Sequence, residues 1–155
     1  MLTLTKKTDY ALIALMHLAK GTEGSVSARE IADQHGVPLP LLMNILKTLT
    51  QEGLIKSVRG PKGGYLLALR ASEITLDRLI GAIEGPIRFV QCSEMGSVQG
   101  RLTCELVDTC PVRSPALRIH NRIKEFLSGM TLAEFAEASD LPRPLRVAET
   151  LELRS

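Results

Sequence analysis

The stretch from residue 37 to residue 69 constrains the fold most, because a helical pattern is followed there directly by a glycine-rich hairpin. Pro38 and Pro40 fit only near a helix start, where an amide donor would lack a partner anyway. Gly53 suits the left-handed stop of that helix. Between them, apolar residues recur at helical spacing and predict an amphipathic helix with one face in the core: Leu41, Leu42, Ile45, Leu46 and Leu49.

The hairpin after this helix consists of two short apolar segments, residues 54–58 and 65–69, which are typical of strands. The turn between them carries Arg59 and Lys62 on either side of Pro61. A basic hairpin directly after a helix with polar exposed positions favours DNA binding. The helix would enter the major groove, and the hairpin would act as a wing on the backbone or in the minor groove.

Two further helices precede this unit and complete a helix-turn-helix pattern. Residues 4–20 are apolar nearly all round, which predicts a buried helix. The sequence Ser27-Ala28-Arg29-Glu30 is a capping box that opens a second helix, which ends at Gly36. An ordinary helical hairpin is the alternative interpretation, but the attached wing favours DNA binding.

The second half of the chain predicts helices around an irregular segment. Thr75 and Gly85 suit the cap and the stop of a helix over residues 76–84. Residues 114–128 carry a helical apolar set beside a basic face, and a long helix after a winged domain favours a dimer contact because operators have two-fold symmetry. A second capping box, which starts at Thr131, opens a short helix.

These patterns predict a mainly α fold with a small β wing, built as a winged helix-turn-helix plus a long dimerisation helix. We expect four parts: a DNA-binding domain over residues 1–85, a cysteine-containing sensor loop over 86–112, the dimerisation helix with the short helix after it over 113–139, and a flexible tail over 140–155.

Charge and cysteine content narrow the class of protein. Residues 1–70 hold nine Lys/Arg against five Asp/Glu, whereas residues 71–155 hold ten against twelve, so the basic half contains the helix and wing. Lys6, Lys7 and Asp9 interrupt the first apolar run, which argues against a signal peptide or membrane span and favours the cytoplasm. Three cysteines in a reducing compartment favour a metal or redox role over disulfides.

Several motifs resemble the Rrf-two (Rrf2) family of bacterial transcription regulators. The resemblance rests on Thr8-Asp9-Tyr10-Ala11 in the first helix, on Ser57-Val58-Arg59-Gly60 with Gly63-Gly64-Tyr65 in the wing, and on the later cysteines, and it covers about residues 1–138. It implies a winged helix-turn-helix with a long dimerisation helix, acting as a homodimer on palindromic double-stranded operator DNA, with no membrane.

The resemblance also implies an iron–sulfur cluster, either 2Fe-2S or 4Fe-4S, held by Cys92, Cys104 and Cys110. The IscR-like pattern has a fourth ligand, His, three residues after the last cysteine, where this chain has Arg113. The NsrR-like pattern takes Asp from the first helix of the partner subunit, and Asp9 matches it, so we prefer Asp9.

The residues leave alternatives open. Asp9 also suits a first-turn carboxylate that complements the helix dipole, and the cysteines also suit free thiols. Zinc held with His120 as the fourth ligand is the alternative cofactor. His17 and His35 stand in helical contexts and are expected to be packing residues.

The resemblance extends unevenly to the DNA contacts. Arg59 matches the wing arginine of the family, which suits a narrow minor groove, and Gly63 belongs to the same motif. We expect phosphate contacts from Lys62, Ser27 and Arg29, and contacts to base edges from Asn44 and Lys47. For each charged residue singly, the alternative is a solvated surface.

The leading hypothesis is therefore a dimeric regulator whose cluster sets its operator affinity in response to iron–sulfur status, redox state or nitric oxide. A cluster-free or zinc-binding regulator that responds to a metabolite or protein partner is the second. An enzyme with a cysteine nucleophile is the least favoured, because no Cys-His-acid arrangement and no glycine-rich nucleotide loop are recognisable in the sequence.

Overall fold

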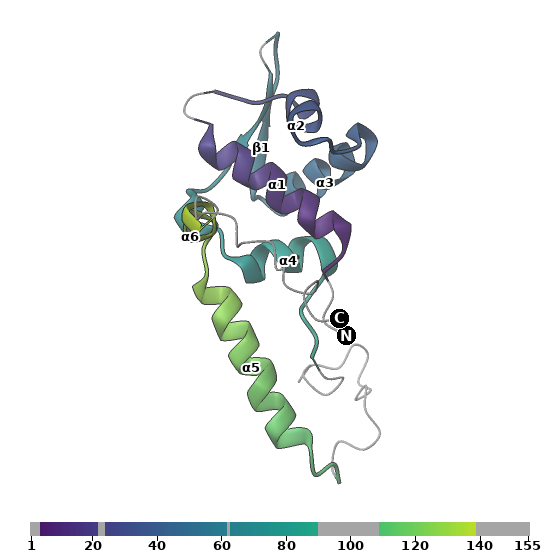
Figure 1. Cartoon of the computed structure of the whole chain (residues 1–155), viewed down its shortest axis with the longest axis vertical. Coiled ribbons are helices and arrows are strands. Elements are labelled where there is room, and N and C mark those ends of the chain that lie inside the picture. The colour runs from purple at the N-terminus through teal and green to yellow at the C-terminus, as the bar shows by residue number, and fades with distance from the viewer. Residues whose placement is uncertain (1–3, 22–23, 62, 90–108, 139–155) are drawn as a thin grey trace, which may run out of the picture.

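The chain folds into a mostly helical winged domain from which one long helix extends (Figure 1). The computed structural model describes residues 4–21, 24–61, 63–89 and 109–138. In chain order the elements are α1 (Lys6–Lys20), α2 (Ala28–His35), α3 (Leu39–Gln51), β1 (Ile55–Val58), β2 (Gly64–Leu67), the 3-10 turn η1 (Ala71–Glu73), α4 (Leu76–Glu84), α5 (Arg113–Gly129) and α6 (Leu132–Ala138). The predicted fold class is confirmed.

The core of the winged domain forms where α1 packs against α3 and α4. Ala11, Ala14 and Leu15 of α1 are completely buried, whereas Lys6, Lys7 and Asp9 at its beginning are exposed. The small alanines allow α1 to approach the leucine-rich face of α3 closely. The prediction of a largely buried first helix is confirmed, with the charged residues confined to its first turn and its last residue.

The helix-turn-helix depends on local capping that the sequence specifies. The hydroxyl of Ser27 accepts a hydrogen bond from the backbone N–H of Glu30 at 3.1 Å, as the predicted capping box requires. Gly36 ends α2 with φ 64°, a left-handed conformation that favours glycine. Pro38 and Pro40 flank the first residue of α3, where neither proline removes a helical hydrogen bond.

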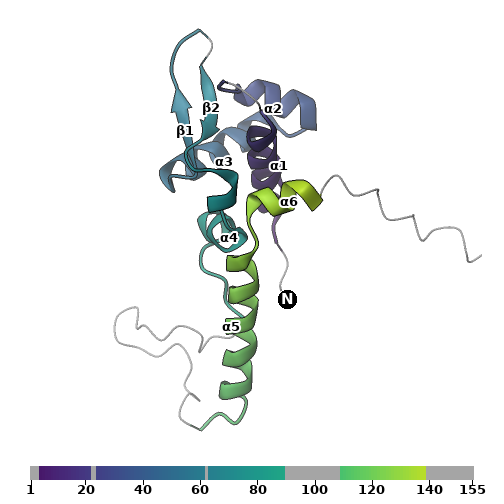
Figure 2. The same cartoon turned by 90° about the vertical axis from the view of Figure 1, so that its left-hand side faces the viewer.

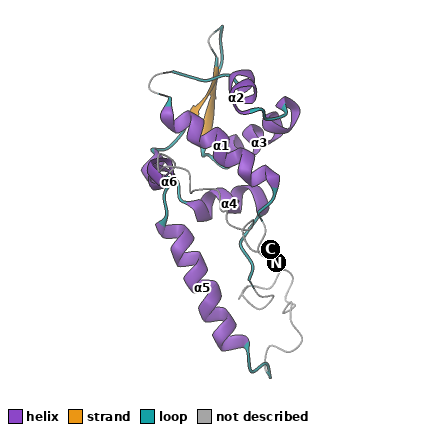
Figure 3. Ribbon diagram, viewed as in Figure 1, coloured by secondary structure: helices purple, strands orange, loops and turns teal. Residues whose placement is uncertain are grey.

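The wing is a two-stranded antiparallel hairpin, drawn in orange in Figure 3. Ile55 pairs with Leu67, and Val58 pairs with Gly64 next to the turn. The sequence predicts strands over residues 54–58 and 65–69, so the observed strands are slightly shorter at their outer ends. Leu54 instead donates its backbone N–H to the carbonyl of Leu49, which makes it part of the helix stop rather than of the strand.

The carboxylate of Glu84 links α4 to the beginning of α1 by hydrogen bonds. Oε1 of Glu84, the last residue of α4, accepts hydrogen bonds from the backbone N–H of Thr5 at 3.1 Å and from the hydroxyls of Thr5 and the buried Thr8, both at 2.5 Å. The hydrogen bonds from Thr5 and then Thr8 lower the pKa of Glu84. This contact joins residues nearly eighty positions apart, and no local pattern predicts it.

α5 projects from the winged domain and its chain runs back toward it, so that the C-terminal end of α5 and the following α6 lie against the domain (Figure 2). The return is fixed by backbone hydrogen bonds from Leu76 to Met130 at 2.9 Å and from Leu132 to Ile74 at 2.8 Å, and Leu132 is completely buried in the core. Thr131 and Glu134 form the predicted capping box. Among the described helices, none combines the length and apolar character needed to cross a membrane.

The Glu84 contact predicts a dependence of stability on pH. A carboxyl whose pKa is lowered on folding contributes stability above its unfolded pKa of about 4.3 and loses it as the pH falls through the lower folded value. Glu84→Gln should therefore have a lower urea midpoint of unfolding than the wild type at pH 7. The difference between the two midpoints should be smaller at pH 3. Glu125→Gln, at an exposed glutamate of α5, is the control. Equal gaps at both pH values would contradict this role.

Candidate nucleic-acid interface and metal centre

α3 presents one apolar and one polar face. Leu42, Ile45, Leu46 and Leu49 are buried at 3% exposure or less, and this face fixes the rotation of the helix. Asn44 and Lys47, three residues apart, are both exposed and therefore share the outer face. Met43 is 45% exposed beside them, so the candidate base-reading surface combines two polar side chains with one flexible apolar side chain.

The beginning of α2 provides a second polar position. Ser27 is half-buried, and its oxygen already accepts the capping hydrogen bond from Glu30, so only its hydroxyl proton is left to donate to a phosphate. Arg29, in the first turn of α2, is exposed. The positive end of a helix dipole favours an anion at this position, which is the physical basis for expecting a phosphate contact.

The wing tip holds Arg59 at the edge of a tight turn. The N–H of Gly63 donates to the carbonyl of Gly60 at 2.9 Å and closes this turn, and Gly60 has φ 123°. A Cβ atom on Gly63 would lie 2.8 Å from the carbonyl oxygen of Gly60, so only glycine fits. Arg59 is exposed, and Lys62 lies outside the described residues.

One contact that sequence reasoning missed ties the wing to α2. Val26, just before α2, forms an isolated bridge with Tyr65 of β2 through hydrogen bonds of 2.9 and 2.8 Å. A Cβ atom on Gly64 would collide with the backbone of Val26, which explains the second glycine of the Gly63-Gly64 pair. The sequence signal was that pair, but the partner of the close approach was not readable from it.

These positions gather at one end of the molecule. Figure 1 places the wing, α2 and α3 together at the end opposite the free end of α5. The helix that carries Asn44 and Lys47 packs against the hairpin that carries Arg59, because β1 follows α3 directly, and a helix in one groove with a wing beside it requires this arrangement.

The candidate metal centre is described only in part. Cys110 is half-buried at the beginning of α5, in a hollow of about 450 Å³ that Arg113 and Arg118 also line. Cys92 and Cys104 lie outside the described residues, so the structure does not bring the three cysteines together or separate them. Among the residues that the structure describes, no three His, Cys, Asp or Glu side chains form a metal-binding group.

Asp9 and His120, the two predicted additional ligands, stand in different environments. Asp9 is exposed in the first turn of α1, in the winged domain, whereas Figure 1 places the Cys110 end of α5 far from that domain. His120 is only 8% exposed, and its Nδ1 has no hydrogen-bond partner in the described parts of the chain. A soft thiolate at Cys110 and an orphaned buried imidazole nitrogen are donors that fit an iron–sulfur cluster or zinc.

The sequence predicts that His17 and His35 are both packing residues, and their exposure in the structure tests this prediction. His35 is exposed, so for His35 the expectation is wrong, and His17 is half-buried. Their ring nitrogens lie 3.0 Å apart, which joins α1 to α2.

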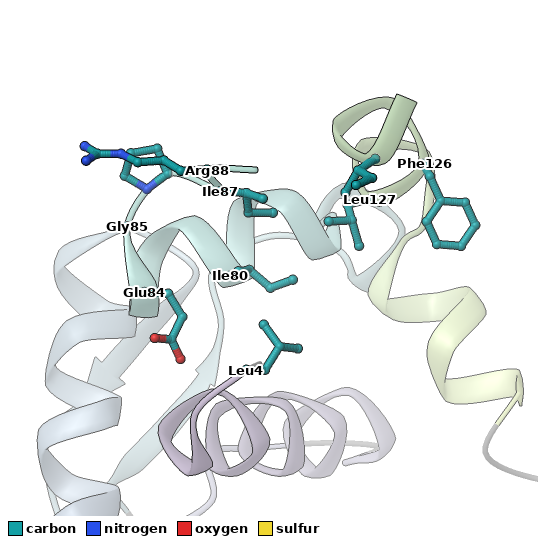
Figure 4. Close-up of a pocket in the computed structure, with 10 residues that line it drawn as sticks. Leu4, Ile80, Glu84, Gly85, Ile87, Arg88, Phe126 and Leu127 are labelled. Atoms are coloured by element: carbon teal, nitrogen blue, oxygen red, sulfur yellow. The ribbon is translucent and has the colours of Figure 1, made fainter. Parts of the chain in front are cut away.

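A second hollow lies where the winged domain meets α5. It has a volume of about 440 Å³ and is lined mainly by apolar side chains, among them Leu4, Ile80, Ile87 and Leu127 (Figure 4). Glu84 stands at its edge with the carboxylate turned to α1. The hollow therefore adjoins both the contact that holds α1 to α4 and the point where the chain leaves α4 for the cysteine segment.

The sequence is similar to known transcriptional regulators over most of its length. A family model for Rrf2, described as an iron-dependent transcriptional regulator, matches residues 4–138. Protein aau3 of Rhizobium meliloti is 36% identical over 135 residues, which cover 87% of this chain and 85% of that protein. The HTH-type transcriptional regulator IscR of Pectobacterium atrosepticum is 33% identical over 139 residues, covering 89% and 81%.

Solved structures show the same architecture. CymR (YrzC), the global cysteine regulator of B. subtilis, matches with a TM-score of 0.69 and 30% identity, covering 90% of this chain and 100% of that one. IscR of T. potens matches with a TM-score of 0.68 and 29% identity, covering 90% and 89%.

Proposed function

This chain belongs to the Rrf2 family of transcriptional regulators, and from that premise we propose that it binds palindromic operator DNA as a homodimer whose affinity is set by an iron–sulfur cluster. The observation that carries the DNA-binding part is the packing of the wing beside α3, with Asn44, Lys47 and Arg59 exposed at one end. Such a regulator works in the cytoplasm, where the operators are.

The residues divide the work of DNA binding. Asn44 and Lys47 read base edges in the major groove, while Arg59 enters the neighbouring minor groove. Ser27, Arg29 and Lys62 hold phosphates, and Gly63 lets the wing backbone turn tightly beside the DNA. The four-part division of the chain at residues 85, 112 and 139 belongs to the same proposal.

The exposed apolar side of α5 supports the proposal of a symmetric dimer. Ile119 is 47% exposed and Phe126 is 63% exposed, an unfavourable state for a helix that faces only water. DNase footprinting should show two inverted half-sites with centres roughly 34–36 Å apart, or a multiple of that distance. A single half-site protected at full affinity by a monomer would contradict the proposal.

Arg59 and Lys62 should contribute differently to DNA affinity. Arg59→Ala should weaken specific binding by about 1–3 kcal/mol and relax base preference where the wing enters. Lys62→Ala should weaken binding evenly across sequences and reduce the slope of log affinity against log salt by about one unit. Fluorescence anisotropy with operator and scrambled duplexes measures both. Equal losses on both duplexes with unchanged salt slopes would reject this division.

Cys92, Cys104 and Cys110 would hold the cluster, and Asp9 of the partner subunit would provide the fourth ligand. Asp9 suits this role because it is exposed on α1, where a second chain can reach it. When bound, the cluster supplies a redox-active group whose potential depends on its ligands. Arg113 and Arg118 line the same hollow as Cys110, so positive charge stands beside the place proposed for the cluster.

A cluster-free or zinc-binding regulator is the second candidate, and two observations favour it. The apolar hollow between α4 and α5 has the volume of a small-molecule site, and His120 offers an unpartnered nitrogen for zinc. A relative of the same fold, CymR of B. subtilis, is also a regulator by its name, the global cysteine regulator. Anaerobic purification with an absorption spectrum and metal analysis separates the candidates: a visible sulfur-to-iron band supports the cluster, and colourless zinc protein supports the alternative. The relatives are named as regulators, and we propose no enzymatic activity.

A further inference from the structure

His17 and His35 bring the ends of two helices into direct contact. His17 lies in the last turn of α1, and His35 is the last residue of α2. Nδ1 of His17 lies 3.0 Å from Nε2 of His35, and the two rings are perpendicular with centroids 5.1 Å apart. Two of the three histidines in the chain thus face each other through ring nitrogens.

A single proton lies between these nitrogens in the metal-free pair. Two neutral rings that both turned lone pairs toward each other at this distance would repel, so one ring must donate an N–H to the other. The contact is therefore an N–H···N hydrogen bond in which one tautomer is fixed. A cation with affinity for imidazole can take the place of that proton.

The surroundings of the pair favour a cation. Both histidines stand at helix C-termini, where unpaired carbonyl groups carry partial negative charge. Partial desolvation and, secondly, the neighbouring His17 lower the pKa of His35, which favours the neutral ring with a free lone pair. His35 is exposed, so an ion in solution reaches the pair directly.

We propose that His17 and His35 form a two-imidazole site for a divalent late transition metal ion such as Zn²⁺. Zinc–nitrogen bonds of about 2.0–2.1 Å at a tetrahedral angle place two nitrogens about 3.3 Å apart. The observed 3.0 Å must widen by only a few tenths of an ångström. The ring that donated the hydrogen bond moves its proton to its other nitrogen, so binding releases no proton, and water completes the coordination.

The site is separate from Cys110, the described cysteine, and its ligands differ from thiols in chemistry. It uses borderline nitrogen ligands on α1 and α2, within the winged domain, and no third His, Cys, Asp or Glu side chain of the described residues joins them in a group. A bound ion would cross-link the end of α1 to the end of α2, directly before the turn at Gly36 that leads to α3. It would therefore stiffen the first half of the helix-turn-helix.

Zinc titration of the full-length chain tests the site through the imidazoles themselves. The wild type, His35→Gln and Gln34→Ala are titrated with ZnCl₂ and followed by long-range ¹H–¹⁵N correlation of the histidine rings. Gln34 is the exposed neighbour of His35 on α2, so its variant keeps both rings. Zinc taken up by the cysteines is the same in all three proteins and cancels from the comparison.

The expected result is a change at Nδ1 of His17 and Nε2 of His35 to the zinc-bound nitrogen shifts in the wild type and Gln34→Ala. His35→Gln should lose one zinc equivalent or bind it about 10–100-fold more weakly. Zinc should also raise the melting temperature of the wild type by several degrees more than it raises that of His35→Gln. Equal stoichiometry in all three proteins, with unmoved His17 and His35 resonances, would show that the pair is only a hydrogen bond and overturn the proposal.

Discussion

A Cys110→Ala variant is expected to lose stable binding of the iron–sulfur cluster. The proposed set of three thiolates and one carboxylate leaves no spare ligand, so removal of any one thiolate, including those of Cys92 and Cys104, would open the cluster to solvent. Ser114→Ala is the matched control, because Ser114 lines the same hollow as Cys110 but provides no thiolate. The measurements are iron and sulfide content and the visible absorption spectrum after anaerobic purification. A wild-type spectrum in Cys110→Ala would reject this ligand set.

Asp9→Ala should have a milder effect in the same assay. A carboxylate binds iron more weakly than a thiolate does, so in the proposed site the bond from Asp9 would be the labile one. The variant should fold and dimerise, lose its cluster faster in air, and show operator affinity that no longer depends on the cluster. If its spectrum, oxygen sensitivity and regulation equal those of the wild type, the fourth ligand is another residue, and His120, buried with an unpartnered Nδ1, is the next to test.

Leu46→Ala is expected to lower the free energy of unfolding by about 2–5 kcal/mol, because the side chain is completely buried and its removal leaves a cavity. That loss is a large part of the roughly 5–15 kcal/mol that stabilises a typical domain. Urea denaturation followed by circular dichroism measures it. The buried face of α3 fixes the rotation of the helix and therefore the direction of its exposed side chains. DNA binding by Leu46→Ala should fall in proportion to the fraction of folded protein.

Lys47→Ala, at the next residue along α3, provides the matched comparison. Lys47 is exposed, so its truncation should change stability by about 0.5 kcal/mol or less. Its operator affinity should nevertheless fall by about 1–3 kcal/mol at low temperature, where both variants are folded. If Leu46→Ala proved as stable as Lys47→Ala, the assignment of the two faces of α3 would be wrong.

The elements that were predictable from sequence are those whose boundaries depend on neighbouring residues. Thr75 and Gly85 bound α4 as predicted, and the capping hydrogen bonds at Ser27 and Thr131 are present. Each of these signals acts within four residues, so a linear reading contains the whole interaction.

The missed features all depend on pairs distant in sequence. Two of them are side-chain contacts, Glu84 with Thr8 and His17 with His35, and the third is the backbone bridge of Val26 with Tyr65. In each pair the tertiary packing decides which groups meet. The burial of His120 was missed for the same reason: the apolar pattern of α5 marks its leucines and isoleucines but not a polar residue among them. The assignment of Cys92, Cys104, Cys110 and Asp9 as ligands stays a prediction.

Within the described parts of the chain, α5 is anchored to the winged domain at one end only, because α6, which follows it, packs into the core of that domain. Its C-terminal end is fixed by the backbone hydrogen bonds between Leu76 and Met130 and between Leu132 and Ile74. The 17 residues of α5 span about 25 Å from this anchored C-terminal end to the N-terminal end, which follows Cys110. A tilt of about 5° there moves the far end by about 2 Å. If α5 moves as a rigid helix, a displacement of about 2 Å at its N-terminal end would reach its contact with α4 as a rotation of about 5°.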